Sequence, residues 1–182
     1  MENISTLINL TNGSKSSRDA AADFILSRPD LHLEFIHSCY EINNPDHHKA
    51  CWILEIIAIR NVNWLKEFLE IICTNTQKLS NESAIRPLSK VLFLLIESHY
   101  KSKKNGIQLT QNQLQQLIET NFDWMITETK VAAKAHAMRS LFLLGKEFDW
   151  IHPELKIILS KDYSKQSTAY KAVARQLLKK IK

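Results

Sequence analysis

The stretch Ala-Ala-Lys-Ala-His-Ala (132–137) places a basic residue at the start of an apolar helical segment, and this arrangement returns along the chain. Similar openings are His-His-Lys-Ala-Cys-Trp (47–52), Ala-Ile-Arg-Pro-Leu-Ser (84–89) and Ala-Tyr-Lys-Ala-Val-Ala (169–174). With a fifth near the N-terminus, the basic residues lie 31, 37, 48 and 37 residues apart: Arg18, Lys49, Arg86, Lys134 and Lys171. Intervals of about 20–50 residues are typical of repeat arrays, so the sequence predicts a helical-repeat protein.

The apolar residues follow a helical period almost throughout the chain. In one segment, Ala50, Ile53, Leu54, Ile57 and Ala58 are spaced so that they share one face of a helix. The pattern predicts about ten helices, at 2–11, 16–27, 30–42, 45–60, 63–78, 81–103, 110–126, 129–144, 149–160 and 166–181. Because the loops between them are short, we expect consecutive helices to be antiparallel neighbours. The expected fold is an all-α, right-handed superhelix of five helix pairs, with residues 1–182 in a single domain.

Glycines and short polar residues mark the expected helix ends. We predict left-handed C-terminal caps at Gly13, Gly106 and Gly145, and N-caps at Ser80, Thr127 and Ser164. The whole chain has only three glycines and four prolines, which argues against a turn-rich β architecture.

The composition is that of a folded protein with one hydrophobic core. Of the 182 residues, 45% are hydrophobic and 24% are charged, which are ordinary values for a globular domain. The longest apolar run, residues 91–96, is far shorter than the roughly 18 residues that indicate a membrane span. No secretory signal is evident, and three cysteines without a CxxC pair predict reduced core thiols. We therefore expect a cytoplasmic protein that makes no membrane contact.

Charge is distributed unevenly along the chain, whose net charge is +5. Residues 128–182 carry twelve Lys and Arg against five Asp and Glu, a net charge of +7, whereas residues 1–127 carry −2. Such an excess favours an anionic partner. It is also typical of a solvated helix that caps the end of a repeat array.

The basic positions resemble those of HEAT and armadillo repeats over most of the chain from about residue 30 onward. In those families each repeat pairs an outer and an inner helix, with an acid in the turn and a base early in the inner helix. Here an acid stands three to six residues upstream of three of the bases: Asp46, Glu82 and Glu128. The resemblance implies a stacked array whose inner face binds other proteins. The chain is also similar to short chains labelled adenylosuccinate lyase, but it lacks the Ser-Ser-x-Met-Pro-x-Lys loop of that superfamily, so we do not expect this activity.

The basic residues would form a row along the inner face if each occupies an equivalent place in its repeat. Stacked helix axes lie about 8–10 Å apart, so neighbouring cations would lie near the Debye length of about 8 Å. Lys90 and Arg175 lie one turn further along their helices, and Trp52 would stack on a bound side chain. The candidate binding residues are therefore Arg18, Lys49, Trp52, Arg86, Lys90, Lys134, Lys171 and Arg175.

Three interpretations of this row are open. In the first, it binds an acidic or helical segment of a protein partner. In the second, each base pairs with the acid upstream, joins the repeats and leaves a neutral seam. The third is nucleic-acid binding, because HEAT-like proteins include DNA glycosylases that excise alkylated bases with Trp, Asp and Arg in a basic cleft.

The sequence shows no pattern typical of a catalytic or metal site. It has no GxSxG, no Gly-rich phosphate loop, no HExxH and no Cys–His signature. His47 and His48 are adjacent, so on a helix they diverge by about 100° and cannot chelate one ion. We expect a non-enzymatic binding or scaffold module without a cofactor. Its partner would be a protein or peptide, and the sequence does not define an oligomeric state.

Overall fold

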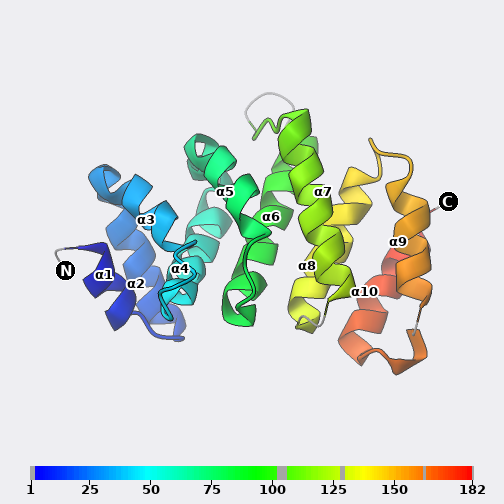
Figure 1. Cartoon of the computed structure of the whole chain (residues 1–182), viewed down its shortest axis with the longest axis horizontal. Coiled ribbons are helices and arrows are strands. Elements are labelled where there is room, and N and C mark those ends of the chain that lie inside the picture. Colours follow the sequence, from blue (N-terminus) through cyan, green and yellow to red (C-terminus); the bar gives the residue numbers. More distant parts are fainter. Residues whose placement is uncertain (1–2, 102–105, 128–129, 162, 182) are drawn as a thin grey trace.

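The computed structural model describes residues 3–101, 106–127, 130–161 and 163–181, and within these ranges every regular element is a helix (Figure 1). The ten α-helices there are α1 (Ile4–Leu10), α2 (Lys15–Leu26), α3 (His32–Ser38), α4 (His47–Arg60), α5 (Leu69–Thr76), α6 (Glu82–Lys101), α7 (Gln111–Ile126), α8 (Val131–Leu144), α9 (Ile151–Ser160) and α10 (Thr168–Leu178). Short 3₁₀ segments span Pro29–Leu31, Val62–Phe68 and Tyr163–Lys165. The predicted all-α class and the ten predicted helices are confirmed.

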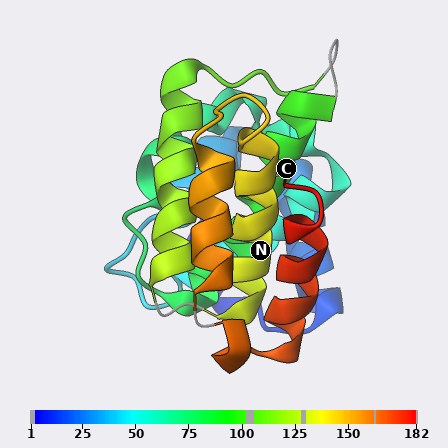
Figure 2. The same cartoon turned by 90° about the vertical axis from the view of Figure 1, so that its right-hand side faces the viewer.

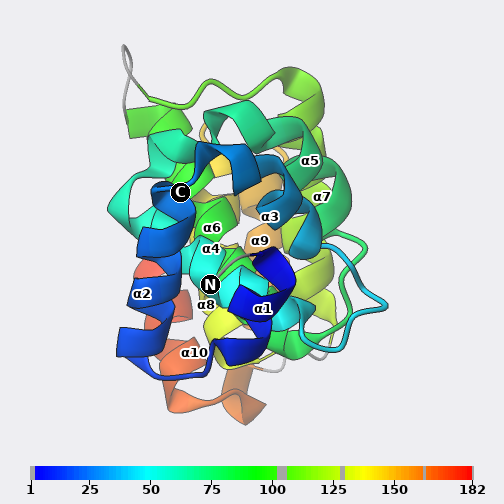
Figure 3. The same cartoon turned by 90° about the vertical axis from the view of Figure 1, so that its left-hand side faces the viewer.

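The even-numbered helices stack on one another along the molecule. Helix α4 contacts α2 and α6, and helix α8 contacts α6 and α10. Among the odd-numbered helices, α5 contacts α7, and α7 also packs on α8. In the two end-on views α5 and α7 lie on one side of α4, α6 and α8, whereas α2 and α10 lie towards the other side (Figures 2 and 3). The chain thus advances pair by pair from one end of its longest axis to the other (Figure 1).

Helix α6 lies at the centre of this stack, between α4 and α8. Its buried apolar side chains repeat at helical spacing: Leu88, Val91, Leu92, Leu95 and Ile96. Similar buried stripes run along α4 and α8. Burial of apolar area contributes about 25 cal/mol per Å², so these facing stripes are the main source of stability in the stack.

The helix ends differ from the sequence prediction in several places. Side chains of Asn3, Ser14, Thr110 and Ser167 provide the N-caps, and Thr110 forms a capping box with Gln113. The predicted N-caps were wrong: Ser80 lies outside α6, Thr127 caps the C-terminus of α7 and Ser164 lies in a 3₁₀ turn. The predicted helix 63–78 is divided, since residues 62–68 are 3₁₀ and only Leu69–Thr76 are α-helical.

Glycine caps were also predicted wrongly, because neither Gly13 nor Gly145 has a left-handed backbone. Gly145 follows α8 with a right-handed φ of −65°. A Cβ at this position would lie 2.2 Å from Cδ2 of His152. The His152 ring is fixed there by its Nε2, 3.0 Å from the Phe142 carbonyl oxygen, and by stacking on the Phe142 ring. Gly145 is therefore needed for the close approach of α9 to α8.

Replacing Leu92 with alanine tests whether α6 is the central helix. Leu92 is 0% exposed, so Leu92→Ala should lower the free energy of unfolding by about 2–5 kcal/mol, through lost burial and a residual cavity. Leu33→Ala, at an exposed site of α3, is the matched control and should change it by about 0.5 kcal/mol or less. Urea denaturation measures both, and a loss below about 1 kcal/mol for Leu92→Ala would contradict the central position of α6.

Candidate functional site

The structure separates the predicted row of bases into different surroundings. Arg18, Arg86 and Lys90 surround one carboxylate, Glu55 of α4. The remaining lysines contact other parts of the molecule, as described below. The bases therefore do not form the single row that the sequence predicts.

The reason is the phase of each base relative to the apolar stripe of its own helix. Lys49 stands one residue before the buried Ala50, Arg86 stands two after the buried Ala84, and Lys134 stands one after the buried Ala133. One residue rotates the side chain by about 100° around a helix. The three side chains consequently leave their helices in different directions.

Arg18 of α2 makes an ion pair that links this group to a neighbouring helix. Its Nη1 lies 3.9 Å from Oε2 of Glu55, and the two side chains are only 20% and 15% exposed. Burial raises the pKa of Glu55, and the charges of Arg86, Arg18 and Lys90 act against that rise. Glu55 is thus a partly buried carboxylate surrounded by three cations.

The positive surface continues from α6 to α8. Lys90 Nζ lies 5.1 Å from the centre of the Phe93 ring, and that ring lies 6.0 Å from the ring of His136. Burial, together with Lys90, Arg139 and Arg86, lowers the pKa of His136 to about 4. His136 is therefore neutral near pH 7 and adds no charge. We call the surface formed by Arg18, Glu55, Arg86, Lys90, His136 and Arg139 the basic face.

Arg139 was missed by the sequence prediction, although a signal for it exists. It follows the buried Ala137 by two positions, as Arg86 follows the buried Ala84. Counting from the apolar stripe therefore places Arg139 on the same side of its helix as Arg86. The predicted row contains Lys134 in its place, which lies nearer the start of α8.

The other predicted bases have separate local roles. Lys49 Nζ lies 3.3 Å from Asp46 Oδ1 and donates a hydrogen bond to the Asn9 carbonyl oxygen at 3.3 Å, which joins α4 to α1. Lys171 Nζ donates to the Ser164 carbonyl oxygen at 2.8 Å. Lys134 lines a pocket with residues of α7 and α9. Arg175 is exposed on α10.

The upstream acids pair with the predicted bases in one of three cases. Asp46 pairs with Lys49, as the neutral-seam interpretation predicts. Glu82 lies 3.8 Å from Lys130 and forms no ion pair with Arg86. Glu128 is outside the described residues. Pairing with an upstream acid thus accounts for Lys49. Arg86 has no ion-pair partner among the residues described.

Trp52 has a structural task that its sequence position does not reveal. Its Nε1 donates a hydrogen bond to the Ser83 carbonyl oxygen of α6 at 3.2 Å. In a regular helix that oxygen accepts from the N–H four residues later, but here this residue is Pro87, which has no N–H. The indole therefore satisfies a carbonyl that proline leaves open, and it ties α4 to α6. This bond and the nearby His48 ring, 4.8 Å away, fix its orientation.

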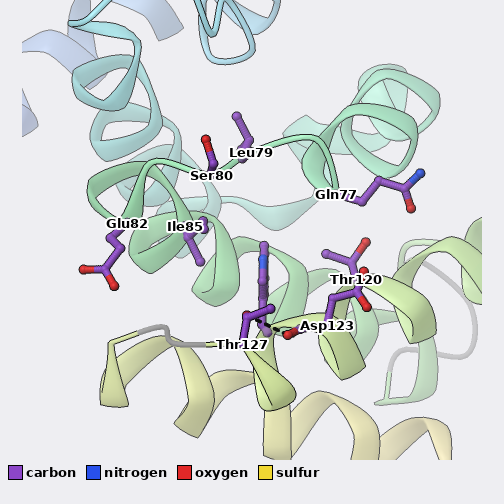
Figure 4. A pocket seen from close by; sticks show the side chains of 9 residues that line it. Gln77, Leu79, Ser80, Glu82, Ile85, Thr120, Asp123 and Thr127 are labelled. Atoms are coloured by element: carbon purple, nitrogen blue, oxygen red, sulfur yellow. Dashed lines mark hydrogen bonds between the residues drawn. The ribbon is translucent and has the colours of Figure 1, made fainter.

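A hollow of about 330 Å³ lies between the α5–α6 connection and α7 (Figure 4). Glu82 and Asp123 line it at opposite ends, and none of the basic-face residues contributes to it. Thr127 Oγ1 donates to the Asp123 carbonyl oxygen at 2.7 Å. Across the described residues, no three His, Cys, Asp or Glu side chains are placed to hold a metal ion. The three cysteines are free thiols in the core.

Comparisons with protein-family models, with curated proteins and with solved structures find no match to this chain. Within the ranges that the structure covers, no helix is both long and apolar enough to cross a membrane. The basic face therefore has to be interpreted from its own geometry and charge.

A double-mutant cycle tests the pairing of Trp52 with the carbonyl that Pro87 leaves open. Trp52→Phe removes the donor and should cost about 1–3 kcal/mol in the free energy of unfolding, since the Ser83 oxygen loses its partner. Pro87→Ala restores a backbone N–H at position 87, so Trp52→Phe should cost less in that background. Chemical denaturation of the four proteins measures the coupling. Equal costs in both backgrounds would contradict the proposed compensation.

Titration of His136 tests the electrostatics of the basic face. NMR should show its imidazole titrating near pH 4, and Lys90→Met should raise this pKa because one nearby cation is lost. The lowered pKa of His136 also makes the stability of the protein depend on pH. Between the unfolded value of 6.5 and the folded value, the unfolded chain binds more protons, so the stability from this group falls as the pH falls through that range. An unchanged midpoint in Lys90→Met would contradict the arrangement.

Proposed function

We propose that the chain is a HEAT/armadillo-type, right-handed superhelical array that acts as a non-enzymatic binding module. Its contact surface is the basic face, and its partner is an acidic segment of another protein. The stacking order α2–α4–α6–α8–α10 supports this proposal, because repeat arrays of this kind present continuous surfaces to extended or helical ligands.

One observation carries the proposal: the basic face has more cations than it can neutralise. Arg18, Arg86 and Lys90 act on the carboxylate of Glu55, and Arg139 lies near them beside His136. Of the four, only Arg18 makes an ion pair within the described part of the chain. A face with three uncompensated cations attracts an anionic ligand, and burial of its surroundings reduces the screening of that attraction by solvent.

A hollow beside the basic face suits an apolar side chain of the same partner. It has a volume of about 320 Å³ and lies between α6, α8 and α10. Phe93, Phe142 and Leu177 provide apolar walls, and Arg139 belongs both to this hollow and to the basic face. A segment with acidic residues and an apolar anchor at helical spacing would contact both surfaces at once.

Glu55 favours a protein over a nucleic acid as the partner. A protein segment can place a basic or neutral group opposite this carboxylate, whereas a phosphate backbone offers only negative charge there. Trp52 is also held by its bond to the Ser83 carbonyl oxygen, so it is not free to stack on a nucleobase. Nucleic-acid binding by a relative of alkylated-base glycosylases is accordingly the second candidate and is decided by the same experiment.

The experiment compares the basic face with the row of bases predicted from the sequence. A fluorescent helical peptide of glutamate and leucine serves as the probe, with its leucine-to-alanine version as a second probe. Arg86→Gln/Lys90→Gln should weaken binding about tenfold, because two ion pairs of up to about 1 kcal/mol each are lost. Lys134→Gln/Lys171→Gln removes the same charge from outside the face and should leave the affinity almost unchanged. Glu55→Gln should strengthen binding.

Two outcomes would contradict the proposal. Equal losses in the two double variants would mean that only net charge matters. Tight binding of duplex DNA that falls steeply between two salt concentrations, with no binding of the peptide, would establish the nucleic-acid candidate, since phosphate contacts release counterions.

A further inference from the structure

A second pocket lies away from the basic face, where α7, α8, α9 and α10 meet. Its volume is about 340 Å³. We call it the α7–α10 pocket, and its lining residues are Met125, Ile126, Lys134, Ile157, Ile158, Lys161, Gln166 and Tyr170. This is where the structure places Lys134, which the function proposed above does not use.

Apolar side chains at this pocket are unusually exposed. Ile126 of α7 is 68% exposed and Ile157 of α9 is 61% exposed. Each Å² of apolar surface left in water forgoes about 25 cal/mol of stabilisation. A ligand with an aliphatic part would recover some of that free energy by covering both side chains.

The polar groups of the pocket are all potential donors to an anion. Lys134, Lys161, Gln166 and Tyr170 line it, and no acidic side chain is among the lining residues that the structure describes. Their side chains make no hydrogen bond or ion pair to the rest of the described structure. Tyr170 is only 3% exposed, and burial raises the pKa of its hydroxyl, which therefore stays protonated.

We propose that the α7–α10 pocket binds a carboxylate attached to a short aliphatic chain. The chain would pack between Ile126 and Ile157, and the carboxylate would accept hydrogen bonds from Lys134 and Lys161. A pocket that combines apolar walls with polar groups can hold such a ligand, and this volume lies at the lower end of the usual range of about 300–1,000 Å³ for small-ligand sites. The same chemistry is offered by a free short-chain acid and by the C-terminal residue of a peptide. The site is independent of the basic face.

Calorimetric titration of the whole chain tests this site with octanoate as the probe. Octanoate should bind saturably, whereas octanol, which lacks the charge, and acetate, which lacks the chain, should bind much more weakly. A peptide that ends in leucine, with a free or an amidated C-terminus, distinguishes the two sources. Binding of the free peptide but not of the amide assigns the site to a chain terminus. Binding of octanoate alone assigns it to a free acid.

Variants show whether the ligand occupies this pocket. Lys134→Met keeps the alkyl stem and removes the charge, so octanoate affinity should fall about tenfold through loss of a charge-assisted hydrogen bond. Lys161→Met should also lower the affinity for octanoate. It replaces Lys134→Met in the test if that variant fails to fold. Lys156→Met, on an exposed position of α9 outside the pocket, is the control and should bind like the unchanged chain. Arg86→Gln/Lys90→Gln should also leave octanoate binding unchanged, which separates this site from the basic face.

The proposal would be overturned by any of three results: no saturable binding of octanoate or the free peptide, equal affinity for octanol and octanoate, or equal affinity in Lys134→Met and Lys156→Met.

Discussion

The apolar contact of α4, α6 and α8 with one another is the constraint on which the remaining structure depends. Helix α6 buries its stripe against α4 and α8, and these two helices also pack on odd-numbered helices. Only part of each helix is left at the surface. Charged side chains in the stack lie at the surface, because burying an unpaired charge is costly. The basic face results from which residues occupy it: Glu55 on α4, Arg86 and Lys90 on α6, and Arg139 on α8.

The same close packing determines the charge state of the face. Partial burial disfavours the charged forms of both Glu55 and His136 and moves their pKa values in opposite directions. His136 becomes a neutral group among cations, and the three basic neighbours of Glu55 favour its ionised form. The arginines remain charged in any such environment. Near pH 7 the positive charge of this surface therefore comes from its arginines and Lys90, and His136 adds none.

The basic face and the α7–α10 pocket both contain cationic side chains, but they differ in character. On the basic face the cations are close together and their fields combine, which suits a ligand with several negative charges. In the α7–α10 pocket two lysines stand beside exposed isoleucines, which suits one negative charge with an apolar part. Lys134 and Arg86 looked equivalent in the sequence, yet they belong to these different surfaces. The difference arises because Arg86 follows the buried Ala84 by two residues and Lys134 follows the buried Ala133 by one, so their side chains leave their helices in different directions.

The sequence by itself determined the number of helices, most of their extents and the stripe that each one buries, because these depend on spacing within a single segment. It also contained the phase that places Arg86 and Arg139 on one side of their helices, since Ala84 and Ala137 mark the buried stripes. Only the tertiary structure decided which side chains meet across helices. The Trp52 bond spans 31 positions to the Ser83 carbonyl oxygen, and the pair of Arg18 with Glu55 joins α2 to α4. Periodicity determines which face of a helix is buried, but the neighbour that covers this face, and the groups left beside it, depend on how the helices pack in space.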